Sequence, residues 1–344
     1  MEENNVDIEK IKKLISDKNN NLDNQTLMYF TNYFYVLVKD GLIPNGITLE
    51  DLIDNAIRYA SKVEFYDENH RVYLENGPDT KGLRDPDTKT IYIRGNLEEP
   101  LKEITIYHEL HHAVQTNPQN NEVGINQESN IGRLIMEAQT QYFAEKIYSE
   151  IHGVSFDEKR IPSENLRMIN NGTVISNLHN YEMYDTLLNK LAIMIDVSKD
   201  YFVSINFLYK NNEGLKDLER KYNEARAKYK LPYDFEGLLL VLDYIYCVDL
   251  VAYKDNPDKQ TILSGKETKS GYEIHPEKYF KLSLHLQRKY MTGFDIDNFL
   301  ALAESDGNFK EFGKFVVDNE KRQLISQFLS TYTPQEQAES HKKK

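Results

Sequence analysis

Two histidines four residues apart mark the segment of this 344-residue chain whose side chains are best suited to chemistry. His108 and His112 lie in the sequence YHELHHA at residues 107–113, which contains the pattern H-E-x-x-H. On a helix, residues four apart lie one above the other, so both imidazoles can bind one metal ion, and the pattern is typical of zinc. Glu109 is displaced by about 100° around the helix axis and can hold a water molecule without binding the ion.

A third protein ligand is expected, because a zinc ion in a catalytic site usually has three protein ligands and one open position. The candidates are Glu128, Glu137 and Glu145. We prefer Glu137, because it lies in a predicted helix over residues 134–148 and has small neighbours that allow two helices to approach closely. Gln141, one helical turn further on, can form a hydrogen bond with a ligand histidine and so orient it.

His111 lies three residues after His108, near the ligand face of the predicted helix but not on it. Two interpretations remain open at this stage. The residue either assists a ligand or the substrate, or it is an ordinary, partly exposed helix residue.

The elements that position these residues can be predicted from the spacing of apolar side chains. The first 60 residues have helical spacing, and Thr48 with Asp51 three positions later resembles a capping box that starts a helix through Tyr59. Beyond about residue 155, the remaining segments have helical spacing or the composition of loops. We therefore expect helices on both sides of the residues between 60 and 155.

Short β-prone segments occur only in the region before the motif. Residues 62–66 and 71–75 predict a hairpin, residues 77–88 predict a loop because they are rich in proline, glycine and aspartate, and residues 90–94 predict a third strand. We expect this third strand to form an edge of the sheet, where an extended peptide can add as a further strand. Pro100 favours the start of a helix that carries the motif and ends near Gln115.

The composition excludes several classes of function. The chain has 42 Lys and Arg against 55 Asp and Glu, a net charge of −13, so we expect no nucleic-acid partner. Its one cysteine, Cys247, excludes an internal disulfide and a cysteine-based zinc site. The acidic start does not resemble a signal peptide, and the apolar run at 238–253 is too short and too charged to span a membrane. We expect a soluble, cytoplasmic protein that does not enter a membrane, and its oligomeric state stays open.

Taken together, these segments resemble the core of the ImmA/IrrE-type zinc metallopeptidases. The likeness rests on the strand TIYI at 90–93, the motif helix ITIYHELHH at 104–112 and the sequence EAQTQYFAE at 137–145, and it covers roughly residues 60–150. The chain departs from the family at three positions, where histidine, threonine and glutamine replace the usual glycine, alanine and asparagine at 111, 140 and 141. The resemblance implies a gluzincin site, in which His108, His112 and Glu137 bind zinc and Glu109 acts as general base.

The resulting expectation for the fold is an α+β protein, with a small sheet packed on the H-E-x-x-H helix and a predominantly helical C-terminal half. Three parts are expected, which are an N-terminal helical segment (1–60), a zincin-like metallopeptidase core (61–150) and a helical C-terminal domain (151–344).

The expected function is hydrolysis of peptide bonds in a protein or peptide substrate, with one zinc ion per chain. Zinc would lower the pKa of its bound water towards 7, and Glu109 would take the proton and pass it to the leaving amine. The first alternative is a zinc-binding, non-hydrolytic helical interaction protein, and the second is a chance occurrence of the motif in a helical binding protein. Glu109 favours the enzyme, because a purely structural site needs no carboxylate at that position.

Overall fold

The computed structural model describes residues 7–77, 80–125, 132–154, 188–189 and 191–229, together with 234, 235, 238, 239 and 242. The chain forms two compact units. The first unit, which contains the predicted site, comprises Met1–Ser129, Ile135–Lys159 and Val197–Leu218, and the second comprises Asn130–Leu134, Arg160–Asp196 and Glu219–Lys344. Among the described residues, none of the helices combines the length and the apolar character that crossing a membrane requires.

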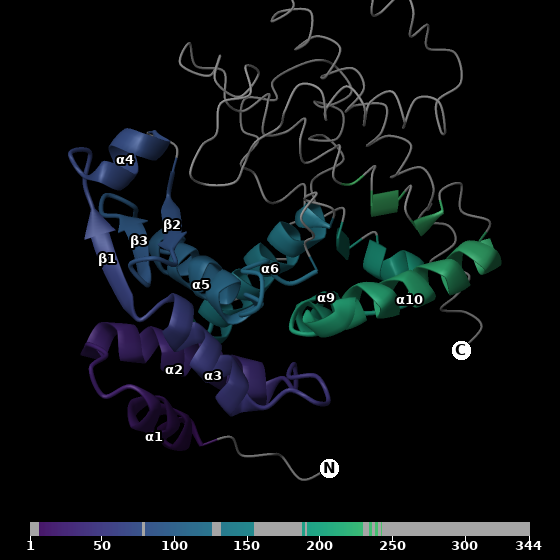
Figure 1. The fold of residues 1–344 in the computed structure, drawn as a ribbon, viewed down its shortest axis with the longest axis horizontal. Coiled ribbons are helices and arrows are strands. Elements are labelled where there is room, and N and C mark those ends of the chain that lie inside the picture. Colours follow the sequence, from purple (N-terminus) through teal and green to yellow (C-terminus); the bar gives the residue numbers. More distant parts are fainter. Residues whose placement is uncertain are drawn as a thin grey trace, which may run out of the picture. The chain divides into compact units, whose positions relative to one another are not determined.

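Three helices open the first unit, namely α1 (Ile8–Lys18), α2 (Asn24–Lys39) and α3 (Leu49–Tyr59) (Figure 1). Each begins next to a side chain that accepts a hydrogen bond from a backbone N–H of the first turn, at Asp7, Asp23 and Thr48. Such caps satisfy N–H groups that have no partner within the helix. At α3 the bonds between Thr48 and Asp51 are reciprocal, so the predicted capping box and its helix are confirmed.

The sheet has three strands in the order β1-β3-β2. The central strand β3 (Thr90–Arg94) pairs in parallel with β1 (Lys62–Tyr66) and antiparallel with β2 (Gly82–Asp85). The strands predicted at 62–66 and 90–94 are confirmed. The expectation that residues 90–94 form an edge of the sheet is wrong, because β1 and β2 flank them on both sides.

The predicted hairpin is also wrong, because residues 71–75 lie in a helix, α4 (Arg71–Asn76). The Nδ1 atom of His70 accepts a hydrogen bond from the N–H of Val72 at 3.2 Å and starts the helix, which buries Val72 beside Tyr66 and Tyr92. A parallel β1–β3 pair needs a long connection between its strands, and α4 forms part of it.

The segment predicted as a loop contains β2. The carboxylate of Asp85 accepts hydrogen bonds from the N–H groups of Asp87 and Thr88 at 3.0 and 3.3 Å, which closes a tight turn between β2 and β3. The turn-forming residues at 85–88 therefore belong to a short hairpin, and the strand lies just before them.

Two long helices follow the sheet, α5 (Leu101–Val114) and α6 (Arg133–His152), and both were predicted. Helix α5 contacts β2 and β3 and also α3, so the expected α+β arrangement of a small sheet on the motif helix is confirmed. The described residues that follow form mainly helices, including α9 (Lys199–Asn206), the 3-10 helix η1 (Lys210–Asn212) and α10 (Glu213–Tyr229). Most of the C-terminal half lies outside the described residues, and the boundaries expected at 60 and 150 stay predictions.

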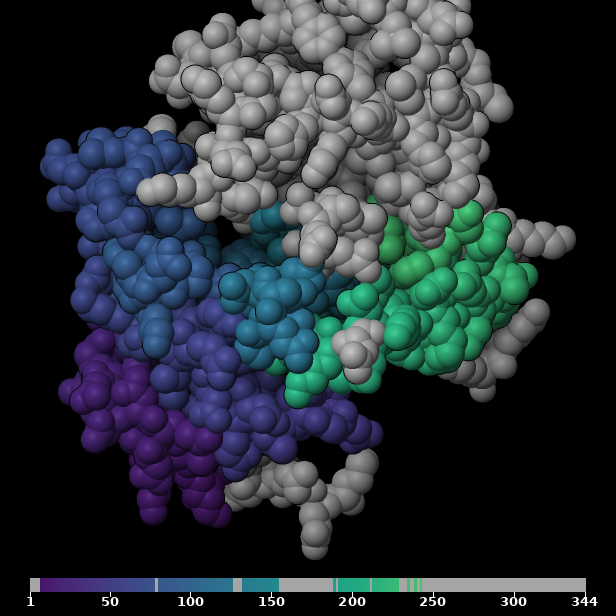
Figure 2. Space-filling model, in the orientation of Figure 1, coloured from purple at the N-terminus to yellow at the C-terminus, as the bar shows by residue number. Residues whose placement is uncertain are grey.

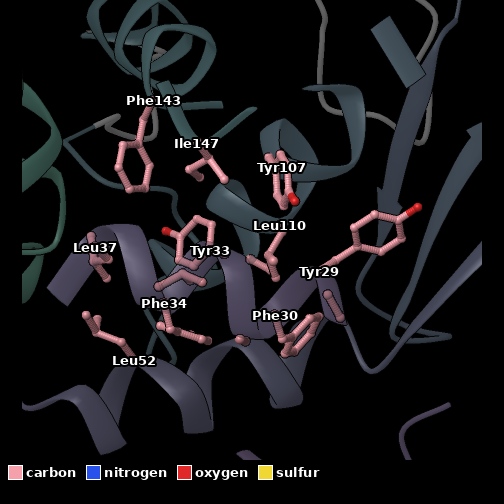
Figure 3. Packing of buried hydrophobic residues seen from close by; sticks show 14 of the residues in the cluster. Tyr29, Phe30, Tyr33, Phe34, Leu37, Leu52, Tyr107, Leu110, Phe143 and Ile147 are labelled. Atoms are coloured by element: carbon pink, nitrogen blue, oxygen red, sulfur yellow. The ribbon is translucent and has the colours of Figure 1, made fainter. Parts of the chain in front are cut away.

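Helix α2 forms the centre of the apolar core of the first unit. Figure 3 shows its side chains, including Tyr33 and Phe34, among residues of α3, α5 and α6. The ring of Tyr33 lies 5.5 Å from that of Phe143 on α6, and the ring of Tyr29 lies 6.0 Å from that of Tyr107 on α5, each edge to face. On the face that Figure 2 shows, the N-terminal helices and the sheet adjoin one another. The N-terminal helices therefore support both helices that carry the predicted ligands.

Replacing Thr48 by alanine should lower the free energy of unfolding by about 1 kcal/mol, because the N–H of Asp51 loses its acceptor at the start of α3. Thr48→Ser keeps the hydroxyl and should retain most of the stability. Urea denaturation followed by circular dichroism measures both variants. An alanine variant that unfolds at the wild-type urea concentration would contradict the contribution assigned to this cap.

Candidate metal centre

The three predicted ligands, His108 and His112 on α5 and Glu137 on α6, meet in the interior of the structure. All three side chains are buried. The Nε2 atoms of the two histidines are 3.0 Å apart, and Oε2 of Glu137 lies 3.3 Å from Nε2 of His108 and 3.4 Å from Nε2 of His112. Among the described residues, this is the one group of histidine, cysteine or acidic side chains arranged to hold a metal ion.

The separations between these three atoms fit a tetrahedral metal ion. Zinc bonds of about 2.0–2.1 Å to nitrogen and oxygen give ligand–ligand edges of about 3.3–3.4 Å in a regular tetrahedron. Both distances from Glu137 match these edges, and the distance between the imidazoles is slightly shorter. Two nitrogens and one carboxylate oxygen are donors that zinc accepts, and they leave the fourth position of a tetrahedron for another molecule.

Burial and mutual contact shift the pKa of each of these groups. Burial alone would raise the pKa of Glu137, but the charges and hydrogen bonds of His112 and His108 hold it well below its usual range. Burial lowers the pKa of His112. At His108, burial is outweighed by the contacts with Glu137 and Gln141 and by the charge of Glu109, so the pKa of His108 is raised. A metal cation binds the deprotonated carboxylate and the neutral imidazole, which are the forms favoured at Glu137 and His112.

Gln141 orients His108. Its Oε1 lies 3.0 Å from Nδ1 of His108, and its Nε2 donates a hydrogen bond to Oε1 of Glu145 at 2.8 Å. Because an amide oxygen only accepts, Nδ1 of His108 carries a proton, and Nε2 is the ring nitrogen that can bind a metal ion. The predicted hydrogen bond of Gln141 is confirmed as a contact with His108.

The other two acids considered as third ligands have different positions. Glu145 contacts Gln141 and is not part of the group around the two imidazoles. Glu128 lies outside the described residues. Among the acidic side chains that the structure describes, Glu137 is therefore the one grouped with both histidines in an arrangement that can hold a metal ion.

Glu109 lies next to the buried group and retains partial access to solvent. Every residue from Ile104 to Asn117 is buried except Glu109, which is half-buried. Its negative charge helps to raise the pKa of His108 and opposes the lowering of the pKa of His112, which indicates that the carboxylate is near both rings. It is not one of the metal-binding group, as expected from its position around the helix axis.

Gly82 is a residue of this region that sequence reasoning missed. A Cβ atom at Gly82 would lie 2.5 Å from Cγ2 of Thr105 and 3.2 Å from Oε1 of Glu109, so the start of β2 approaches α5 too closely for a side chain. A glycine inside a strand often marks such an approach, but the composition of residues 77–88 predicts a loop and so does not indicate it.

His111 is fully buried, so its interpretation as a partly exposed residue is wrong. Its ring nitrogens contact Tyr33 of α2 and Gln139 of α6. The packing of these two helices on α5 removes His111 from solvent, and the spacing of residues along α5 alone contains no information about that packing.

Replacing Gln141 by leucine should weaken zinc binding by about 10–100-fold, because Nδ1 of His108 loses its acceptor and the ring loses its fixed orientation. Competition with a chromophoric chelator measures the affinity. Gln119→Leu is the matched control, since Gln119 is exposed in the turn after α5. Equal zinc affinity in the Gln141 variant and in the wild-type protein would contradict the role assigned to this hydrogen bond.

Comparisons of the chain with protein-family models, with curated proteins and with solved structures found no match. The functional assignment of the chain therefore depends on the chemistry of its own residues. Those residues are a buried His-His-Glu group positioned to bind a metal ion and a half-buried glutamate beside it.

Proposed function

We propose that this protein is a zinc-dependent metallopeptidase of gluzincin type that hydrolyses peptide bonds of a protein or peptide substrate. The observation that carries the proposal is the meeting of His108, His112 and Glu137 at one buried point, with Glu109 directly after the first of them. These are the residues for which the resemblance to ImmA/IrrE-type metallopeptidases implies the roles of zinc ligands and general base.

The positions of these residues suit both parts of the reaction, which are the activation of water and carbonyl by the metal and the transfer of a proton by Glu109. A zinc ion held by His108, His112 and Glu137 would lower the pKa of a bound water to about 7 and polarise a carbonyl oxygen. The carboxylate of Glu109 can take a proton from the attacking water and pass it to the nitrogen of the leaving amine. A carbon–oxygen bond forms as the carbon–nitrogen bond breaks, and Glu109 returns to its ionised form.

Strand β2 supports a peptide as the substrate. It pairs with β3 on one side, and no strand among the described residues pairs with its other edge. Such an edge has N–H and C=O groups with which an extended peptide can pair. Because Gly82 at the start of β2 lies against Glu109, a peptide along this edge would pass close to the proposed general base. We therefore assign to β2 the role of peptide-binding edge that the sequence predicts for residues 90–94.

Replacing Glu109 by glutamine should preserve zinc binding and lower the rate of peptide hydrolysis by about 100-fold or more, because an amide of the same shape cannot accept the proton. Cleavage of a mixed peptide library, followed by mass spectrometry with and without a chelator, measures hydrolysis, and elemental analysis measures zinc. Glu75→Gln is the control, since Glu75 is exposed on α4.

Three other outcomes would change the assignment. Cleavage by the Glu109 variant at the wild-type rate would show that this residue is not the general base. A wild-type protein that holds zinc and cleaves nothing would favour the non-hydrolytic interaction protein. A wild-type protein that holds no zinc would favour a chance occurrence of the motif.

A further inference from the structure

A second buried polar group lies beside the metal ligands and has no part in the proposed reaction. It consists of Tyr33 on α2, His111 on α5, Gln115 directly after α5 and Gln139 on α6, which we call the His111 cluster. All four side chains are fully buried. Polar side chains in such surroundings are costly unless they are hydrogen-bonded to one another.

The hydrogen bonds of the His111 cluster fix the orientation of its imidazole. Nδ1 of His111 lies 2.5 Å from Oη of Tyr33, and Nε2 lies 2.8 Å from Oε1 of Gln139. The amide nitrogen of Gln139 donates to Oε1 of Gln115 and to the carbonyl oxygen of Met136, both at 2.9 Å, so its amide oxygen is the atom that faces the ring. Nε2 of His111 also lies 2.7 Å from Nε2 of Gln115, so the imidazole contacts Tyr33 through Nδ1 and both glutamines through Nε2.

Aromatic rings enclose the same imidazole. The ring of Phe143 on α6 lies 4.9 Å from that of His111, and the ring of Phe207, which follows α9, lies 5.7 Å from it. These contacts leave the imidazole little freedom to turn, so the direction in which its Nε2 atom points is defined by its surroundings.

Helix geometry connects this cluster with the metal ligands. Glu137 and Gln139 are two residues apart on α6, so their side chains leave the helix about 200° apart around its axis. Helix α5 contacts both of them, Glu137 through the two ligand histidines and Gln139 through His111. Two attachments on different sides of α6 fix its rotation about its own axis, and that rotation determines where the carboxylate of Glu137 lies.

We propose that Tyr33 and His111 are positioning residues for the metal site. The hydroxyl of Tyr33 orients the imidazole of His111, and the imidazole holds Gln139 so that Glu137 stays in contact with both ligand histidines. The proposal rests on the metal site of the proposed function and does not depend on peptide hydrolysis.

The test compares two tyrosine variants that each lose one hydroxyl. Tyr33→Phe removes the hydroxyl that contacts Nδ1 of His111. Tyr29→Phe removes a hydroxyl from another buried tyrosine of the same helix, which accepts a hydrogen bond from Nε2 of Gln25 at 3.2 Å. Zn²⁺ affinity is measured by chelator competition, the geometry of the site by the visible absorption of bound Co²⁺, and stability by thermal unfolding. We expect Tyr33→Phe to bind Zn²⁺ about tenfold more weakly and to change the Co²⁺ spectrum. Tyr29→Phe should match the wild-type protein in both.

The outcomes separate a positioning role from simple packing. If Tyr33→Phe is only less stable, with wild-type Zn²⁺ affinity and Co²⁺ spectrum, the proposal is wrong. Gln139→Met is a second variant that removes the contact from the side of α6, and it should change the affinity and the spectrum in the same direction. A wild-type protein that binds Zn²⁺ and cleaves no peptide would contradict the proposed function and leave this inference intact. A wild-type protein that binds neither Zn²⁺ nor Co²⁺ would overturn both.

Discussion

The site depends on one constraint, which is that two imidazoles and a carboxylate are buried within contact distance of each other. Removing such groups from water costs free energy unless each finds a partner. Oε2 of Glu137 lies near both histidines, and Gln141 satisfies the outer nitrogen of His108. A cation at the same point would balance the carboxylate and accept the lone pairs of both rings. An arrangement that is costly in an apolar interior is therefore well suited to a metal ion.

The surrounding fold separates the ligands from the proposed general base. Helix α5 packs against α2, α3 and the sheet, and its two buried histidines contact α6. Between Ile104 and Asn117, Glu109 is the one residue that is not buried, and Gly82 at the start of β2 lies against its side chain. Ligand and base are thus adjacent in sequence but lie in different surroundings. The proposed reaction needs this difference, since the base must reach a substrate that arrives from solvent.

Local features of the chain were predicted well, and features that depend on distant contacts were not. The helices α5 and α6 and the placement of His108 and His112 on one face of α5 follow from helical periodicity. Residues 71–75 contain side chains that suit either a strand or a helix, and the cap at His70 with the burial of Val72 determined the outcome. The burial of His111 depends on Tyr33, which lies 78 positions earlier in the chain, and no local pattern contains that contact.

X-ray absorption at the zinc edge of the zinc-loaded protein tests the central claim most directly, because it reports the number and type of atoms bound to the metal. We predict one zinc ion per chain with nitrogen and oxygen neighbours at about 2.0–2.1 Å and the outer-shell signal of two imidazoles. In His112→Ala, that signal should fall to one imidazole or the zinc should be lost. Stoichiometric zinc with an unchanged spectrum in His112→Ala would contradict the assignment of the metal site to His108, His112 and Glu137.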